Sequence, residues 1–113
     1  MHEFSIGQAL MERIEAEAAA RGATAVHRVR LTIGDQSGVE PDLLTTAFDI
    51  LKEHGLCHGA ALDIERVPAR WACSSCGRDI PPGEILRCGA CGAIARLVSG
   101  DEIVLAQLEM EVP

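Results

Sequence analysis

Four of the five cysteines occur as two Cys-x-x-Cys pairs, Cys73/Cys76 and Cys88/Cys91, with eleven residues between the pairs. Two residues between thiolates allow one tight turn to present both sulfurs to the same ion. A glycine follows each pair directly, and glycine tolerates the positive φ that turns backbone N–H groups toward the sulfurs. Two such turns facing each other complete a tetrahedral shell of four thiolates, which suits Zn²⁺ and leaves no position open for a substrate. The pattern therefore predicts a structural zinc ribbon.

Two alternatives for these cysteines are a disulfide pair and a rubredoxin-like iron centre. The cysteine count is odd, and the first residues show neither the basic region nor the apolar stretch of a secretory signal. We therefore expect a cytoplasmic protein, in a compartment where disulfides are rare. The sequence alone does not exclude iron as the ion bound by the four cysteines.

Length and charge limit the remaining classes of protein. With 113 residues, 48% of them hydrophobic, the chain is long enough for one small domain carrying an insert. No apolar run approaches the ~20 residues that span a bilayer, so no membrane segment is predicted. The net charge is −7. Residues 70–98 hold four arginines against two acidic residues, and a zinc ion with four thiolates would cancel that excess. The surface typical of nucleic-acid binding is therefore not predicted.

Two helices are indicated by the apolar periodicity. A capping box at Ser5 and Gln8 precedes apolar residues at four-residue steps, and Gly22 follows them, which predicts a helix over about 6–21. A second helix is expected to start at Pro41 in its first turn and to run to Gly55. The first helix also carries an acidic face, interpreted as solvated, that consists of Glu12, Glu15 and Glu17.

Three strands are indicated by alternation of apolar and polar residues. They are centred on residues 28–33, 62–65 and 104–112. In the last of these, Val104, Ala106, Leu108, Met110 and Val112 are expected to share one face. The cysteine segment falls between the second and third strands. The predicted fold is α/β, with two helices on a three-stranded sheet and an inserted four-cysteine zinc ribbon. Residues 1–69 and 99–113 would form the α/β domain, and residues 70–98 the ribbon domain.

The first three residues, Met1-His2-Glu3, form a second candidate metal site. Methionine normally stays on a chain whose second residue is bulky, so the free α-amine should belong to Met1. This amine, the deprotonated peptide nitrogen of His2 and its imidazole can close fused chelate rings around one ion. Such a nitrogen-rich set suits Ni(II) or Cu(II) better than Zn²⁺. The predicted helix follows at once, which places the tripeptide near the positive end of a helix dipole.

Taken together, these features closely resemble the HypA/HybF family of nickel metallochaperones, which act in maturation of nickel–iron hydrogenase and in some cases serve urease. The resemblance covers essentially the whole chain in order. The matching segments are Met1-His2-Glu3, the turn at residues 34–41, the lead into the ribbon at residues 67–69, and the two Cys-x-x-Cys-Gly turns.

The resemblance implies a non-enzymatic carrier that binds Ni(II) as cargo and Zn(II) as a structural ion. It further implies hand-off with a HypB-like GTPase to the hydrogenase large subunit, and a homodimer in some members. The nickel ligands would be the Met1 amine and His2, with Glu3 a further candidate. Glu40 occupies a position where some members have an implicated aspartate, and the longer side chain here leaves two roles open, ligand or favourable charge at the second helix.

The histidines and the fifth cysteine were also considered as metal ligands. Its histidines lie at positions 2, 27, 54 and 58, outside the ribbon, so a fixed site of Cys73, Cys76, Cys88 and Cys91 is expected. Cys57 beside His58 is interpreted as an ordinary loop or partly buried thiol.

The alternative functions are a zinc-ribbon module acting on nucleic acid or the transcription machinery, and an iron electron-transfer protein. No phosphate-binding loop or pair of catalytic carboxylates is visible, so no catalytic residue is assigned.

Overall fold

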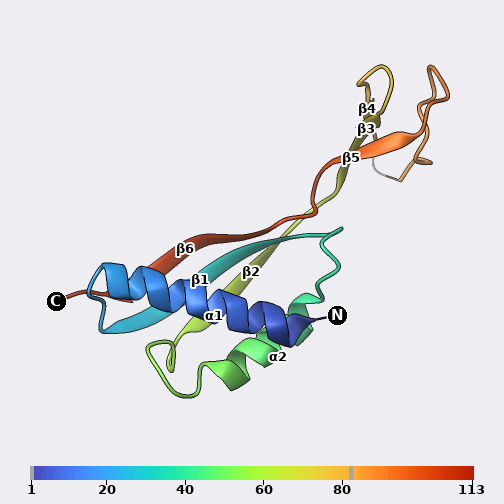
Figure 1. Cartoon of the computed structure of the whole chain (residues 1–113). Helices are drawn as coiled ribbons and strands as arrows, with labels where there is room; N and C mark the ends of the chain where they lie inside the picture. Colours follow the sequence, from blue (N-terminus) through green and yellow to red (C-terminus); the bar gives the residue numbers. More distant parts are fainter. Residues whose placement is uncertain (1, 82) are drawn as a thin grey trace.

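A computed structural model describes residues 2–81 and 83–113 of the chain, and it shows the predicted α/β fold with an inserted ribbon (Figure 1). The elements in chain order are α1 (Glu3–Ala20), β1 (Ala25–Gly34), α2 (Pro41–Leu51), β2 (Ala61–Val67), β3 (Arg70–Cys73), β4 (Asp79–Ile80), β5 (Ala95–Ser99) and β6 (Ile103–Glu111). The strands form two three-stranded sheets, in the orders β2-β1-β6 and β4-β3-β5. None of the described helices is both long and apolar enough to cross a bilayer.

Both helices cover one face of the β2-β1-β6 sheet. The central strand β1 runs parallel to β2 and antiparallel to β6. Its buried side chains Val29, Leu31 and Ile33 pack in one cluster with Ile14 of α1 and Phe48 of α2. The predicted four-residue periodicity of α1 is confirmed, because its apolar stripe faces this cluster. The opposite face of the sheet is polar: Arg28 forms ion pairs with Asp63 on one neighbouring strand and Glu109 on the other.

Helix α1 starts earlier than predicted. His2 is the N-cap residue, Glu3 is the first helical residue, and the helix end has no side-chain cap. The expected capping box at Ser5 is therefore wrong. The first helical bond runs from the Ile6 N–H to the His2 carbonyl, at 2.9 Å, so Ser5 already lies in the first turn. The predicted stop is confirmed, since Gly22 has φ of 66° just beyond the helix end.

Helix α2 begins at Pro41 as predicted but ends at Leu51 instead of Gly55. The Lys52 N–H makes the last helical bond, to the Phe48 carbonyl at 2.9 Å. The Lys52 ammonium group then donates to the Ala60 carbonyl at 2.8 Å. This contact folds the following loop back toward the start of β2, so the chain leaves the helix before the glycine.

Strand β6 departs from simple alternation. In its pairing with β1, Leu31 lies opposite Leu105 and the adjacent Arg30 lies opposite Gln107, which leaves Ala106 as an extra residue. This β-bulge shifts the alternation by one residue in the first half of the strand. Leu105 therefore packs on the core in place of the predicted Val104 and Ala106, whereas the predicted positions of Leu108 and Met110 are confirmed. Val112 lies beyond the strand and is exposed.

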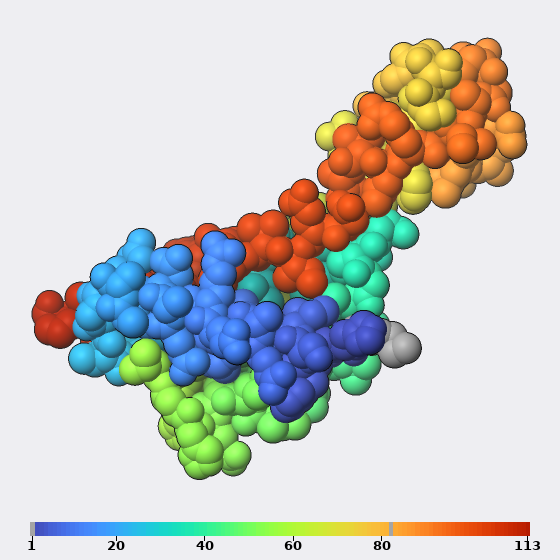
Figure 2. Space-filling model, viewed as in Figure 1, coloured from blue at the N-terminus to red at the C-terminus, as the bar shows by residue number. Residues whose placement is uncertain are grey.

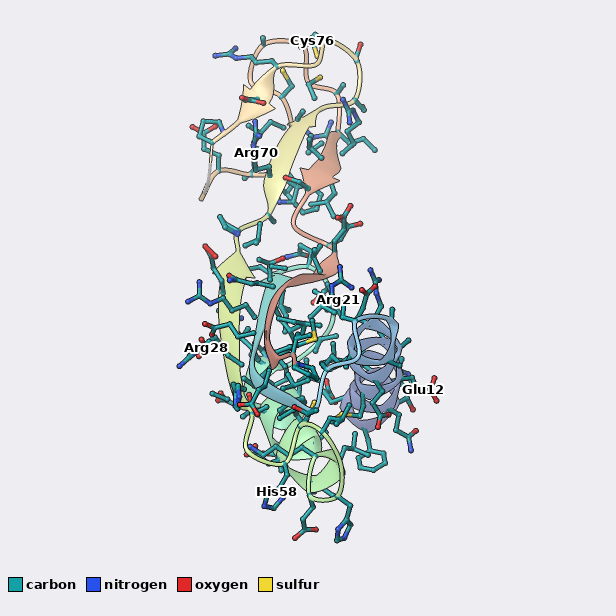
Figure 3. All side chains as sticks on the ribbon, turned by 90° about the vertical axis from the view of Figure 1, so that its left-hand side faces the viewer. Glu12, Arg21, Arg28, His58, Arg70 and Cys76 are labelled. Atoms are coloured by element: carbon teal, nitrogen blue, oxygen red, sulfur yellow. The ribbon has the colours of Figure 1, made fainter. Side chains whose placement is uncertain are left out.

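The second sheet belongs to the ribbon, which projects from one end of the helix-covered sheet (Figure 1). The molecule is correspondingly elongated, with principal extents of 58 × 25 × 17 Å. Figure 3 shows Cys76 at the far tip of the ribbon and Arg28 on the distant sheet. The two connections to the ribbon are the short segments at residues 68–69 and 100–102.

The turn after β1 is hydrogen-bonded to both of these connections. The Asp35 N–H donates to the Val67 carbonyl at the end of β2, at 2.9 Å. The Gln36 N–H donates to the Gly100 carbonyl, which lies after β5, at 2.8 Å. The Gly34 N–H donates to the Glu102 carbonyl at 2.9 Å. One turn therefore holds the segment that enters the ribbon and the segment that leaves it.

Two glycines make this close approach feasible. A Cβ on Gly34 would lie 2.1 Å from the Gly100 carbonyl oxygen. A Cβ on Gly100, whose φ is 102°, would lie 2.6 Å from the Ala69 Cα. Because both collisions are with backbone atoms, no side chain can rotate to relieve them.

The replacement Gly34→Ala is therefore expected to destabilise the helix-covered sheet by about 2–4 kcal/mol. A matched control is Gly59→Ala, because an added Cβ there meets nothing within 4 Å and the residue has no positive φ. We expect the control to leave stability unchanged or slightly raised. Urea unfolding midpoints of the two variants test this, and equal midpoints would contradict the role given to Gly34.

Candidate metal sites

The four predicted cysteines converge at the tip of the ribbon. The Sγ atoms of Cys73, Cys76, Cys88 and Cys91 all lie within 4.8 Å of one another. The Cys73 and Cys91 sulfurs are 3.2 Å apart, and those of Cys76 and Cys88 are 3.8 Å apart. In a regular tetrahedron with metal–sulfur bonds of ~2.3 Å, the sulfurs are ~3.8 Å apart. The cluster thus has the size of a four-thiolate shell around one ion.

Each cysteine pair is shaped by a tight turn that ends in a glycine. Gly77 and Gly92 have φ values of 76° and 75°, as the sequence predicted. Their N–H groups donate to the carbonyls of Cys73 at 3.1 Å and Cys88 at 2.9 Å, and so close the two turns. One cysteine of each pair is buried and the other is exposed. The sulfurs are therefore collected between two similar turns rather than in a deep cavity.

Backbone N–H groups stabilise the thiolate form of the buried cysteines. The N–H groups of Cys76 and Ser75 donate to the Cys73 Sγ at 3.4 and 3.3 Å. These bonds lower the pKa of Cys73 to about 6. Bonds from the N–H groups of Cys91 and Ala90 likewise lower the pKa of Cys88. Because the thiolate is the form that binds metal, both turns are prepared for an ion such as Zn²⁺ or iron.

The second candidate site lies at the start of α1. Met1 lies outside the described residues. His2 is exposed and has φ of 63°, a left-handed conformation that is rare for a residue with a side chain. Its carbonyl accepts the first helical bond. At a helix N-terminus the first N–H groups have no partner within the helix, so the peptide nitrogen of His2 is not used by α1 itself.

Glu3 joins the two helix starts. The side chain is buried, with 9% of the residue exposed. One carboxylate oxygen accepts a hydrogen bond from the Glu40 N–H at 3.1 Å. The pKa of Glu3 is lowered to about 2, and the hydrogen bond from the Glu40 N–H is one cause of this. The carboxylate is therefore ionised at neutral pH and holds the N-terminal end of α1 against the residue preceding α2.

Of the predicted nickel residues that the structure describes, Glu3 and Glu40 are in contact, whereas the side chains do not gather around a common point. Glu3 and Glu40 meet through the backbone of Glu40, whose own side chain is exposed at the N-cap of α2. Within residues 2–81 and 83–113, the cysteines are the one group of three or more potential ligands whose atoms cluster. The carboxylates of residues 3 and 40 therefore do not form a preassembled cage with the His2 imidazole.

Cys57 and His58 do not act as a pair in this fold. The Cys57 side chain is in the core with 1% of the residue exposed, and burial raises the pKa of its thiol. The His58 side chain is exposed and its Nδ1 lies 2.8 Å from the Glu53 carbonyl oxygen. Figure 3 shows His58 at the edge of the molecule. We expected an ordinary loop or partly buried thiol, and the structure buries this thiol completely.

The contact that sequence reasoning missed is the one between Glu3 and the Glu40 backbone. No pattern marks it, because the donor is a main-chain N–H. The role of Gly100 was also missed, although this glycine directly follows strand β5 and an isolated glycine beside a strand is a signal of close backbone approach.

Comparisons with known proteins agree with these features. Residues 1–110 match the family model described as hydrogenase/urease nickel incorporation, metallochaperone, hypA. The hydrogenase maturation factor HypA of Geobacter metallireducens is 45% identical over 113 residues, covering 98% of this chain and 100% of the relative. HypA of Shewanella baltica strain OS223 is 42% identical, covering 98% and 97%.

The fold matches solved structures of the same family. The solution structure of the Ni metallochaperone HypA from Helicobacter pylori is 29% identical, with a TM-score of 0.76 and full coverage of both chains. A second solution structure, of a HypA protein, is 28% identical with a TM-score of 0.78 and covers 100% of this chain and 98% of that chain. The chain therefore belongs to the HypA family of hydrogenase and urease nickel-incorporation metallochaperones.

Proposed function

We propose that this protein binds Ni(II) and delivers it during maturation of nickel–iron hydrogenase, with a second role toward urease open to it. The observation that carries the proposal is the family match over residues 1–110. The protein is a carrier and not an enzyme in this proposal, and it acts in the cytoplasm. Family membership favours this function over the nucleic-acid and electron-transfer alternatives.

The ribbon would hold a structural Zn(II). Four thiolates supplied by Cys73, Cys76, Cys88 and Cys91 form a closed set, in which no position is left for cargo that must enter and leave. The two metals would then be bound in separate parts of the chain. Residues 70–98 would form the zinc domain, and residues 1–69 with 99–113 the nickel-binding domain.

Nickel would be held at the start of α1. The proposed ligands are the Met1 amine with the backbone nitrogen and imidazole of His2, because these atoms can close fused rings around one ion. Glu3 and Glu40 complete the candidate set. The bond between the Glu3 carboxylate and the Glu40 N–H supports a positioning role for Glu3, since it ties the chelating residues to the N-terminal ends of both helices.

The exposed position of the proposed nickel site suits a protein that carries an ion and then releases it. A site built on an exposed, terminal residue can exchange its ion by direct contact with a recipient. Release would follow when a recipient offers better ligands. The proposed recipients are the hydrogenase large subunit and a HypB-like GTPase, and the chain would also form a homodimer.

The GTPase contact is expected to use the acidic face of α1, where Glu12 and Glu15 are exposed and Glu17 is paired with Arg21 at 2.8 Å. The variants Glu12→Lys and Glu15→Lys should weaken binding of the GTPase about tenfold each, and Glu17→Lys should do the same with some loss of helix stability. Affinity of purified GTPase for each variant, measured by calorimetry, tests this.

A charge-matched control is Glu53→Lys, since this exposed residue lies outside α1. It should leave the affinity for the GTPase unchanged. If Glu53→Lys weakened GTPase binding as much as the α1 variants do, the effect would come from the net charge of the chain and not from a contact at α1. Normal delivery of nickel to hydrogenase in cells that lack such a GTPase would remove this part of the proposal.

A further inference from the structure

The ribbon carries arginine side chains that its own carboxylates do not pair. Outside residues 70–98 the chain has six arginine and lysine side chains, and five of them form ion pairs: Arg21, Arg28, Arg30, Lys52 and Arg66. The ribbon has four arginines, of which Arg70 forms an ion pair with Asp79 at 3.7 Å. In the part of the chain that the structure describes, Arg78, Arg87 and Arg96 have no carboxylate partner. The ribbon therefore differs from the rest of the chain in leaving most of its cations unpaired.

Two of these arginines share one face of the ribbon with an exposed isoleucine. Arg87 lies directly opposite Ile94 in an isolated antiparallel bridge, so the two side chains lie on the same face. Ile94 leads directly into β5, where Arg96 follows two residues later and lies on that face again. Ile94 is 62% exposed, and both arginines are exposed as well. We call the surface formed by Arg87, Ile94 and Arg96 the arginine face.

The proposed zinc ligands do not account for the charge of Arg96. In the pairing of β3 with β5, Arg96 lies opposite Ala72, and the next pair is Cys73 with Ala95. Successive pairs of an antiparallel ladder point to opposite faces, so the Arg96 side chain points away from the Cys73 sulfur. A carboxylate of a partner could therefore pair with Arg96 without displacing a contact of the metal site.

Arg87 is held in place by the chain itself. Its Nη1 group donates to the Gly92 carbonyl at 2.7 Å, beside the second cysteine turn. A guanidinium group has five N–H donors, so this bond leaves others for a carboxylate. A cation whose position is already fixed loses less conformational entropy when it binds.

We propose that the arginine face binds an acidic segment of another protein, in which carboxylate and aliphatic side chains lie two residues apart. Guanidinium groups bind carboxylates through paired hydrogen bonds, and an aliphatic side chain of the segment would cover Ile94. Side chains two residues apart in an extended chain are about 6–7 Å apart, and Ile94 and Arg96 have this spacing in sequence along an extended segment. This surface lies on the ribbon and not on α1. The inference rests on the fold alone and holds whether or not the chain carries nickel.

The observations favour a polypeptide over a nucleic acid as the partner. Single-stranded nucleic acids stack their bases on aromatic side chains, whereas the arginine face has an aliphatic side chain and no aromatic one. The net charge of −7 opposes the approach of a phosphate backbone. In Figure 2 the ribbon, in yellow and orange, stands clear of the helix-covered sheet. A protein segment can therefore reach the ribbon without contacting the helices.

NMR titration of the full-length, zinc-loaded protein with a synthetic peptide tests this proposal. The peptide repeats Val-Ser-Glu-Ser over about eight residues, and in an extended conformation it presents valine and glutamate on one face. Its addition should shift the amide signals of Arg87, Ile94 and Arg96 and leave those of α1 unchanged. Control peptides have lysine in place of glutamate or serine in place of valine. Each control should bind at least tenfold more weakly.

Substitutions locate the contact. Arg96→Glu should weaken binding of the Val-Ser-Glu-Ser peptide at least tenfold, and Ile94→Ser about threefold. Arg13→Glu is the charge-matched control, since Arg13 is exposed on α1 and has no carboxylate partner within residues 2–81 and 83–113. It should leave the affinity for the peptide unchanged. All three variants should keep one zinc per chain.

Four results would overturn the proposal. The first is that the Val-Ser-Glu-Ser peptide leaves the signals of the arginine face unchanged. The second is equal weakening by Arg13→Glu and Arg96→Glu, which would reflect net charge. The third is loss of zinc from Arg96→Glu, which would assign this arginine to the metal site. The fourth is tighter binding of the lysine peptide, or of a single-stranded RNA oligonucleotide, than of the glutamate peptide.

Discussion

Replacing Cys73 or Cys91 with serine is expected to release the ribbon metal and to unfold the ribbon, while the helix-covered sheet stays folded. The ribbon has little else to hold it together: the buried apolar residues among its described positions are Ala72, Cys73, Ile80 and Cys88, and two of these are proposed metal ligands. Ile85 and Ile94 are 75% and 62% exposed. Binding of a structural zinc ion supplies about 10–16 kcal/mol in peptides of this size, so loss of one ligand should exceed the ribbon's own stability.

Metal content by mass spectrometry and the amide spectrum of each variant measure this effect. The unmodified protein should carry one zinc per chain. Cys57→Ser is the matched control, because Cys57 lies in the core beneath the helices and outside the cluster. It should lower the stability of the helix-covered sheet and leave zinc stoichiometric. Iron in the purified protein, or full zinc occupancy in Cys91→Ser, would overturn the zinc assignment.

Extending the N-terminus by a few residues is expected to abolish tight nickel binding as completely as His2→Ala does. The extension converts the α-amine of Met1 into a peptide nitrogen and so removes one proposed ligand. Isothermal titration with Ni(II) should give one site per chain for the native terminus, and at least a hundredfold weaker binding for both altered proteins. Zinc content and fold should be unchanged, since Cys73, Cys76, Cys88 and Cys91 lie in the ribbon.

The same residues added at the C-terminus are the control and should leave nickel affinity unchanged. Glu40→Ala should have a smaller effect, because this side chain is exposed and its backbone N–H, which contacts Glu3, is retained. Equal affinity of the N-terminally extended and native proteins would show that the terminal chelate is wrong.

Nickel affinity should also fall as the solution is acidified below about pH 6.5, since protons compete for the amine and imidazole nitrogens. Glu3 does not explain a loss in that range. Its pKa is lowered from 4.5 to about 2, so the stability that its carboxylate contributes is complete above pH 4.5 and is lost only as pH falls toward 2. Titrations between pH 5.5 and 8 on native protein and Glu3→Gln separate the two effects, because the pH dependence should persist in the variant.

Much of the fold followed from local patterns. The four-residue apolar stripe of α1, Pro41 at the start of α2 and the two cysteine turns were all predicted, since each depends on residues near in sequence. The capping box at Ser5 failed because a distant group decided the helix start: the Glu40 backbone holds Glu3 at the first helical position. The alternation in β6 failed because a bulge depends on pairing with β1, which the strand's own residues do not reveal.

The candidate sites divide in the same way. The clustering of the four ribbon cysteines could be predicted because Cys-x-x-Cys spacing fixes the local geometry of each pair. The arrangement at the start of α1 could not, because it depends on a contact between residues 37 positions apart in the chain. The sequence suggested Glu3 as a candidate ligand, whereas its observed partner is the main chain of Glu40.

The turn that holds both ribbon connections has a consequence for chain entropy. Residues 67 and 102 are both hydrogen-bonded to the Gly34 turn, and 34 residues separate these two positions in the chain. Strand β6 can therefore pair with β1 only after this 34-residue segment has closed into a loop. If the ribbon is unfolded, this loop is long and flexible. A folded ribbon brings its own ends together and shortens the effective loop to a few residues. The logarithmic dependence of closure entropy on length makes this difference about 2 kcal/mol. Metal bound at the tip would thus stabilise a sheet that it does not touch.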